Sequence, residues 1–141
     1  MNEQELIREA LKAKQFSYAP YSGFHVGAAL LTKGQKVYTG CNIENAAYTP
    51  TNCAERTAVF KAVSEGEREF EAIAIVGDKE ECLAPCGVCR QVLTEFVNPK
   101  EFAVIMAGSG GKYEKRTLEE LFPSSFSPAD LTEDKEKTEK I

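Results

Sequence analysis

Two short cysteine motifs constrain this chain more than any other feature of its sequence. Cys53 is followed by Ala54 and Glu55, and about thirty positions later Cys86 and Cys89 form a Cys-x-x-Cys pair. Three thiolates suit one zinc ion (Zn²⁺), and a tetrahedral zinc with three protein ligands keeps a fourth position open, as catalytic zinc sites do. A carboxylate beside that position can carry protons. The motifs therefore predict a zinc-dependent hydrolase, with Cys53, Cys86 and Cys89 as ligands and Glu55 as the catalytic proton carrier.

Each motif also has a less specific interpretation. A Cys-x-x-Cys pair by itself is a redox pair or half of a structural zinc site about as often as it is part of a catalytic zinc site. Glu55 in the first turn of a helix would by itself only interact favourably with the helix dipole. The combination of both motifs favours the catalytic interpretation. Cys41 and Cys82 have no partner at ligand spacing and are expected to be ordinary thiols.

Both motifs are expected to begin helices. A helix N-terminus presents unpaired N–H groups and about half a positive charge, which lowers the pKa of a thiol placed there. Three thiolates would nevertheless leave the zinc cluster with a net negative charge and weaken it as a Lewis acid. Arg56 and Arg90 each follow a motif residue and could offset this charge by hydrogen bonds to sulfur. Arg56, beside Glu55, is the preferred candidate.

Composition limits the partners of this protein. The chain has 141 residues, 43% of them apolar, which fits one domain with a single core. No apolar run reaches the roughly 18 residues that a membrane-spanning helix needs. The net charge is −5 and no basic block is visible, which argues against a nucleic-acid partner. The N-terminus lacks the basic and apolar regions of a signal peptide, and five cysteines form an odd set for a disulfide framework. We therefore expect a cytoplasmic protein that acts on a small molecule, with neither nucleic acid nor a membrane as partner.

Hydrophobic periodicity and turn residues divide the chain into alternating elements. The predicted helices cover residues 2–16, 53–64, 86–97 and 117–121, and the predicted strands cover residues 24–31, 37–43, 72–76 and 102–106. This order implies an α/β fold with a mixed sheet covered by helices on both sides. We expect one domain over residues 1–126, followed by a charged C-terminal tail, residues 127–141, that is frayed or forms an exposed helix.

Longer blocks around the motifs resemble the small homotetrameric zinc-dependent cytidine deaminases, which act on free nucleosides. The matching blocks are residues 18–29, 40–48 and 85–91, together with the Cys-Ala-Glu motif, and the resemblance extends over about residues 1–126. It implies a three-layer α-β-α sandwich around a mixed five-stranded sheet, one zinc ion per chain, and a homo-oligomer, specifically a tetramer. The implied reaction is hydrolytic deamination of cytidine and deoxycytidine to uridine and deoxyuridine, with release of ammonia, in pyrimidine salvage.

The resemblance also implies roles for residues outside the zinc motifs. Asn42 and Glu44 match positions that hydrogen-bond the ribose 3′-hydroxyl, and Phe24 matches an aromatic that packs on the pyrimidine. Phe126 matches an aromatic that reaches the site of a neighbouring subunit. The remaining positions are Ile43 and Ala54 for substrate binding, the latter through its backbone N–H, and Ala46 and Tyr48 for the subunit contact.

Without the resemblance, these residues have simpler interpretations. Phe24 would be a core strand residue, Asn42 and Glu44 an ordinary exit from a strand, and Phe126 an anchor for the C-terminus. Two alternative functions also stay open. One is deamination of another cytosine nucleoside, such as a nucleoside antibiotic. The other is a non-enzymatic zinc module that binds nucleic acid, against which the acidity of the chain and Glu55 argue.

Overall fold

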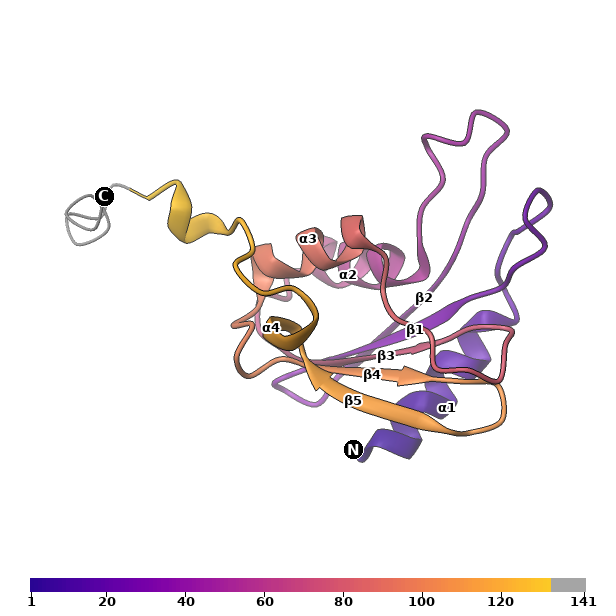
Figure 1. Cartoon of the computed structure of the whole chain (residues 1–141), viewed down its shortest axis with the longest axis horizontal. Helices are drawn as coiled ribbons and strands as arrows, with labels where there is room; N and C mark the ends of the chain where they lie inside the picture. Colours follow the sequence, from indigo (N-terminus) through magenta and orange to yellow (C-terminus); the bar gives the residue numbers. More distant parts are fainter. Residues whose placement is uncertain (133–141) are drawn as a thin grey trace.

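A five-stranded sheet with helices on both faces forms the body of the protein (Figure 1). The structure is a computed structural model that describes residues 1–132. Its elements, in chain order, are α1 (Glu3–Lys14), β1 (Gly27–Thr32), β2 (Val37–Cys41), α2 (Ala54–Ser64), β3 (Phe70–Val76), α3 (Gly87–Phe96), β4 (Ala103–Ala107), β5 (Tyr113–Thr117), α4 (Leu118–Leu121) and a 3₁₀ helix (Pro128–Asp130).

The strands follow the order β2-β1-β3-β4-β5. β1 pairs antiparallel with both β2 and β3, β3 pairs parallel with β4, and β4 pairs antiparallel with β5. The parallel pair is connected through α3, because a parallel pair needs a long crossover, whereas β1 and β2 are joined by a tight turn. The predicted mixed sheet is confirmed.

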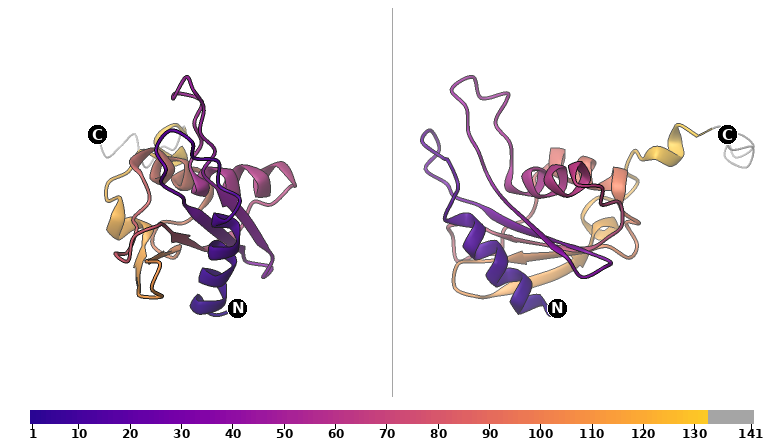
Figure 2. Two further views of the ribbon diagram at one scale, coloured as in Figure 1. Left: turned by 90° about the vertical axis from the view of Figure 1, so that its right-hand side faces the viewer. Right: turned by 180° about the vertical axis from the view of Figure 1, so that it is seen from behind.

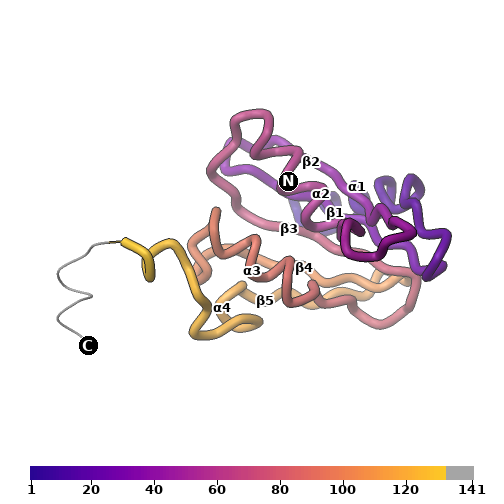
Figure 3. The backbone as a smooth tube through the Cα atoms, turned by 90° about the horizontal axis from the view of Figure 1, so that it is seen from above, coloured from indigo at the N-terminus to yellow at the C-terminus, as the bar shows by residue number. Residues whose placement is uncertain are grey.

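Each face of the sheet buries its own hydrophobic cluster. Ala29 and Leu31 of β1 contact the cluster that includes Leu6 and Ala10 of α1, whereas the alternate residues of β1 join the cluster beneath α2 and α3. All six residues of β1 are buried, as expected for a strand covered on both sides. Figure 3 shows α2 and α3 side by side above the sheet. The predicted three-layer α-β-α sandwich is therefore confirmed.

The sheet edges differ from the expectations. The pattern of apolar residues did not reveal β5, because all but the last of its residues are exposed and its sequence is polar. The first predicted strand begins three residues later than expected, at Gly27, and β2 ends at Cys41 rather than at residue 43. Ile43 instead makes isolated bridges with Tyr18 and Asn52.

Two groups of segments extend away from the sheet. The connections before β1 and between β2 and α2 project at one end of the molecule, and the segment after α4 leaves at the other end (Figures 1 and 2). Of the predicted tail, residues 128–130 form a 3₁₀ helix, while residues 133–141 lie outside the described part of the chain. Among residues 1–132, no helix has the length and apolarity needed to cross a membrane.

Candidate metal centre and active site

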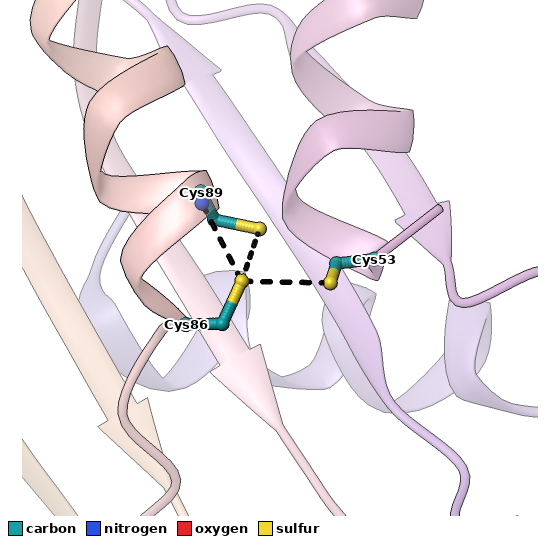
Figure 4. Close-up of side chains that lie close together, drawn as sticks. All are labelled: Cys53, Cys86 and Cys89. Carbon is teal, nitrogen blue, oxygen red and sulfur yellow. Dashed lines mark hydrogen bonds between the residues drawn. The ribbon is translucent and has the colours of Figure 1, made fainter. Parts of the chain in front are cut away.

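The three motif cysteines converge between the starts of two helices (Figure 4). The sulfur atoms of Cys86 and Cys89 lie 3.2 Å apart, and those of Cys53 and Cys86 lie 3.6 Å apart. All three sulfurs lie within 4.8 Å of one another. Tetrahedral zinc with Zn–S bonds of about 2.3 Å holds its sulfur ligands about 3.8 Å apart. The three thiols therefore fit one zinc ion.

Local helix capping explains this convergence. Cys53 is the N-cap of α2, and Cys86 is the N-cap of α3, where its sulfur accepts a hydrogen bond from the backbone N–H of Cys89. Gly40 lets α2 approach the sheet closely, because a Cβ at this position would lie 2.5 Å from both the carbonyl oxygen of Ala54 and the backbone nitrogen of Ala58. The first turn of α2 is thereby held against β2, with Cys53 facing α3.

The cysteine cluster favours a thiolate at Cys53. A hydrogen bond from Cys89 lowers the pKa of Cys53 to about 5, against the effect of burial, and a hydrogen bond from Arg56 contributes. Nη2 of Arg56 lies 3.4 Å from the sulfur of Cys53. Within the described residues, the buried Nε of Arg56 has no hydrogen-bond partner. The guanidinium group thus places positive charge directly on the cluster.

Arg90 is placed differently from Arg56. Its Nε donates to the carbonyl oxygen of Pro85 at 2.9 Å, and its Nη1 donates to the carbonyl oxygen of Leu121 at 2.6 Å. In the part of the chain that the structure describes, no sulfur accepts a hydrogen bond from Arg90. The hypothesis that Arg90 offsets the thiolate charge by bonding to sulfur therefore has no support in this geometry.

Glu55 lies next to the cluster in the first turn of α2 and is only 5% exposed. Burial raises the pKa of its carboxyl group, and the nearby thiolate of Cys53 raises it further. Hydrogen bonds involving the Cys89 side chain and the Cys86 backbone partly oppose this rise. A carboxyl group with a raised pKa is suited to accept and return a proton.

Asn42 fixes the segment that carries Phe24. The side-chain oxygen of Asn42 accepts from the backbone N–H of Val26 at 2.9 Å, and its amide nitrogen donates to the carbonyl of Phe24 at 2.8 Å. The ring of Phe24 lies against Gly77, where an added Cβ would be 3.0 Å from Cζ of the ring. Among residues 1–132, Asn42 donates one side-chain hydrogen bond, so the second N–H of its amide group can bond to another partner.

Asp78 holds the neighbouring residue of the same segment and was not predicted. Its Oδ2 accepts from the backbone N–H of His25 at 2.6 Å and lies 3.0 Å from the ring Nδ1, while Lys14 Nζ lies 3.0 Å from Oδ1. Burial opposes the shift, but these bonds, led by that from the His25 backbone, lower the pKa of Asp78 to about 2. The position of Asp78, just after the apolar run of β3, was the available signal.

Glu44 lies in the projecting loops. Its Oε1 accepts from the backbone N–H groups of Tyr21 at 2.9 Å and Ser22 at 3.1 Å, and its Oε2 accepts from the Ser22 hydroxyl. The bond from the Ser22 side chain lowers the pKa of Glu44. Glu44 also lines a shallow cavity of about 360 Å³ together with Tyr21, Ser22, Tyr48 and Thr51. None of the three clustered cysteines lines this cavity.

The remaining predicted residues fall into buried and exposed groups. Ala54 is fully buried, whereas Ile43, Ala46 and Tyr48 are exposed on the loop between β2 and α2. Phe126 is also exposed, and its carbonyl accepts from Gln91 Nε2 at 2.8 Å. Phe126 lines a small cavity with Gln91 and Glu95, which lie farther along α3 than the cysteines. Phe126 therefore does not join the cysteine cluster of its own chain.

Comparisons with known proteins agree with this site. A family model of the cytidine and deoxycytidylate deaminase zinc-binding region matches residues 1–106. The cytidine deaminase of Sporosarcina psychrophila is 51% identical over 132 residues, which cover 94% of this chain and 96% of that protein. The crystal structure of a cytidine deaminase from Burkholderia pseudomallei matches with a TM-score of 0.86 and 46% identity, covering 89% of this chain and 100% of that one.

A related protein with a different name is also similar. The blasticidin-S deaminase of Bacillus cereus is 34% identical over 111 residues, which cover 73% of this chain and 77% of that protein. The matched family region contains all three clustered cysteines and Glu55. The chain therefore belongs to the cytidine and deoxycytidylate deaminase family, and its cysteine cluster is suited to hold the zinc of that family.

Proposed function

We propose that this protein hydrolyses cytidine and deoxycytidine to uridine and deoxyuridine and releases ammonia, as expected for pyrimidine salvage. The observation that carries the proposal is the juxtaposition of three cysteine sulfurs, within 4.8 Å of one another, with the buried carboxyl group of Glu55. The similarity to two proteins named cytidine deaminase, over 94% and 89% of this chain, supports the same reaction.

Glu55 is the proposed catalytic residue. Zinc held by Cys53, Cys86 and Cys89 would supply a Lewis acid that makes water a stronger nucleophile at neutral pH. Glu55 takes a proton from the attacking water, whose oxygen bonds to C4 of the cytosine ring. The carboxylic acid delivers this proton to N3. The restored carboxylate then takes the second proton from the new hydroxyl on C4 and gives it to the amino group, so that the C4–N bond breaks, ammonia leaves and the C4 carbonyl of uridine forms. The raised pKa of Glu55 suits a group that must both accept and return protons.

Substrate recognition is proposed to use residues around Glu55 and in the adjoining loops. Ala54 lies at the first position of α2, where a backbone N–H has no partner in the helix and can donate to the base. Phe24 offers an aromatic face to the pyrimidine, with Ile43 beside the substrate. Asn42, through its remaining amide N–H, and Glu44 address the ribose 3′-hydroxyl. Cytidine and deoxycytidine share this hydroxyl, so both are proposed substrates.

A homotetramer is the proposed assembly. Phe126, in the segment after α4, is 57% exposed, and Tyr48, in the loop between β2 and α2, is 70% exposed. These exposed rings are available to pack against another subunit. Phe126 would then complete the site of a neighbouring subunit, and Ala46 and Tyr48 would lie at a subunit contact. Sedimentation should show a tetramer, and a fully active monomer would exclude these roles.

The proposed compartment is the cytoplasm. All five cysteines are free thiols in the structure, and a reducing compartment keeps such thiols available for metal binding.

A second candidate substrate is a cytosine nucleoside antibiotic. The similarity to a blasticidin-S deaminase, at 34% identity, is the observation in its favour. The cytidine deaminase of Sporosarcina psychrophila is more similar, at 51% identity, so cytidine remains the first candidate. Comparing kcat/KM for cytidine, deoxycytidine and blasticidin S decides between the two. A higher value for the antibiotic would replace the proposed substrate.

The direct test follows the ultraviolet absorbance of cytidine. On mixing with the zinc-loaded protein, the cytosine band should shift to that of uridine and ammonia should accumulate in equal amount. A strong zinc chelator should stop the reaction, and added zinc should restore it. Unchanged absorbance for cytidine, deoxycytidine and the antibiotic would reject the proposed activity.

A further inference from the structure

The side chain of Arg90 connects two parts of the chain that lie 36 positions apart, Pro85 and Leu121. Its Nε bonds to the carbonyl of Pro85 at 2.9 Å, and its Nη1 bonds to the carbonyl of Leu121 at 2.6 Å. The backbone N–H of Arg90 also donates to the carbonyl of Cys86 at 3.0 Å. Arg90 therefore bonds to the carbonyl group of Pro85, which precedes the ligand Cys86, and to the carbonyl group of Cys86 itself.

Cys86 needs such support more than the other clustered cysteines. It is exposed, whereas Cys89 is fully buried and Cys53 is partly buried. Cys86 precedes the first residue of α3 and follows an irregular connection from the end of β3. The position of its sulfur therefore depends on how firmly the Pro85–Cys86 backbone is held.

The other end of the connection, Leu121, belongs to α4, a helix anchored in the core. Leu118 of α4 is fully buried in the core, and its backbone N–H donates to the carbonyl of Phe102 at 3.0 Å. Thr117 and Glu120 form a capping box at the start of α4. The carbonyl of Leu121 lies at the C-terminal end of this helix, where carbonyls lack helical partners and favour a cation.

We infer that Arg90 is a positioning residue of the metal centre, which holds Cys86 in place by joining the Pro85 carbonyl to the end of α4. The planar guanidinium can donate to both carbonyls at fixed angles, which a lysine ammonium does not reproduce. Arg90 acts on backbone geometry, whereas Arg56 contacts a sulfur directly. The adjacent Gln91 bonds to the carbonyl of Phe126, so the same turn of α3 also holds the segment after α4.

Zinc release tests this role without using the deaminase reaction. The inference about Arg90 rests on the zinc site of the proposed function but not on the proposed substrate. The role of Arg90 and the deaminase reaction can therefore fail separately. Zinc-loaded wild type, Arg90→Ala and Arg90→Lys are mixed with a chromophoric chelator, and the rate of zinc transfer is followed. Arg68→Ala is the matched control, because Arg68 Nη1 also binds two carbonyls, of Val63 and Glu67 at 2.8 Å each, beyond the far end of α2.

Arg90→Ala should release zinc about 10- to 100-fold faster than wild type, as is usual when a group that orients a metal ligand is removed. Arg90→Lys should lie between the two, and Arg68→Ala should stay within about twofold of wild type. The Co²⁺-substituted Arg90→Ala protein should also show an altered ligand-field spectrum. Zinc release from Arg90→Ala at the Arg68→Ala rate would overturn the inference, even if its thermal stability fell. If Arg90→Ala does not fold, wild-type release from Arg90→Lys would overturn it equally.

Discussion

The cysteine cluster and the projecting loops before β1 and between β2 and α2 are built in different ways. Cys53, Glu55, Cys86 and Cys89 lie at the starts of two helices that pack on the central sheet. Glu44 and Tyr48 lie instead on the projecting loop between β2 and α2, and Oε1 of Glu44 accepts hydrogen bonds from the backbone N–H groups of Tyr21 and Ser22 in the loop before β1. The cysteines and Glu55 are therefore brought together by helices packed on one sheet, while residues expected to choose the substrate lie on exposed loops.

This difference predicts how substitutions act. Changes in the helix starts should reduce the chemical step or zinc retention and leave substrate affinity almost unchanged. Changes in the loops should mainly raise KM, because they alter how the substrate is held.

The largest effect is expected from Glu55. Glu55→Ala and the isosteric Glu55→Gln should lower kcat by about 10³-fold or more, because each removes the carboxyl group proposed to carry the protons beside the cysteines. Both variants should keep one zinc per chain, measured by metal analysis. Near-normal turnover by Glu55→Gln would show that another group carries the protons.

Arg56 should have the next largest effect. Arg56→Ala removes the cation 3.4 Å from the sulfur of Cys53 and should reduce zinc affinity or kcat by about 10- to 100-fold. Arg56→Lys should recover part of the loss, since it restores the charge. Zinc titration and steady-state kinetics measure both quantities, and wild-type values for Arg56→Ala would mean that the charge of the thiolates is balanced elsewhere.

Substitution of Asn42 tests whether the segment that carries Phe24 serves substrate binding rather than the chemical step. Asn42→Ala removes two hydrogen bonds that hold the Phe24 segment and should cost about 1–3 kcal/mol of unfolding free energy. It should also raise KM more than it lowers kcat. The control is Asn98→Ala, which loses a local bond to the backbone of Lys100. A fall in kcat with unchanged KM would contradict the division between chemistry and recognition.

Asp78 should have the smallest effect, and it depends on pH. The pKa of Asp78 is about 2 in the folded protein, below its ordinary value of 3.8. A carboxylate with a lowered pKa stabilises the fold above about pH 4, and this contribution is lost as the pH falls through about 2.

The difference in unfolding free energy between wild type and Asp78→Asn should therefore be present at about pH 7 and shrink toward about pH 2.5. Urea unfolding of the metal-free, reduced proteins measures it, with the exposed Glu81→Gln as control. If the difference in unfolding free energy grew as the pH fell, the lowered pKa of Asp78 would be contradicted. KM of Asp78→Asn should rise slightly, because Asp78 holds the residue next to Phe24.

Structural features that depend on neighbouring residues in the sequence were predictable. The helix starts at Cys53 and Cys86, the capping box of Thr117 and Glu120, and the buried runs of β3 and β4 all depend on residues within a few positions of one another. The cysteine spacing and the neighbouring Glu55 were sufficient to predict a zinc site, because helix capping places the side chains at such positions in a known direction.

Contacts between distant segments were decided by the tertiary structure. The polar strand β5 is held by its pairing with β4 rather than by an apolar pattern, and Arg90 reaches Leu121 rather than a sulfur. Asn42 follows β2 and Asp78 follows β3, and the side chains of both accept hydrogen bonds from the backbone next to Phe24. The chain alone determined which groups could bind metal and move protons, since these depend on residue type and local spacing. The fold decided which backbone each polar side chain holds, because that depends on which elements pack side by side.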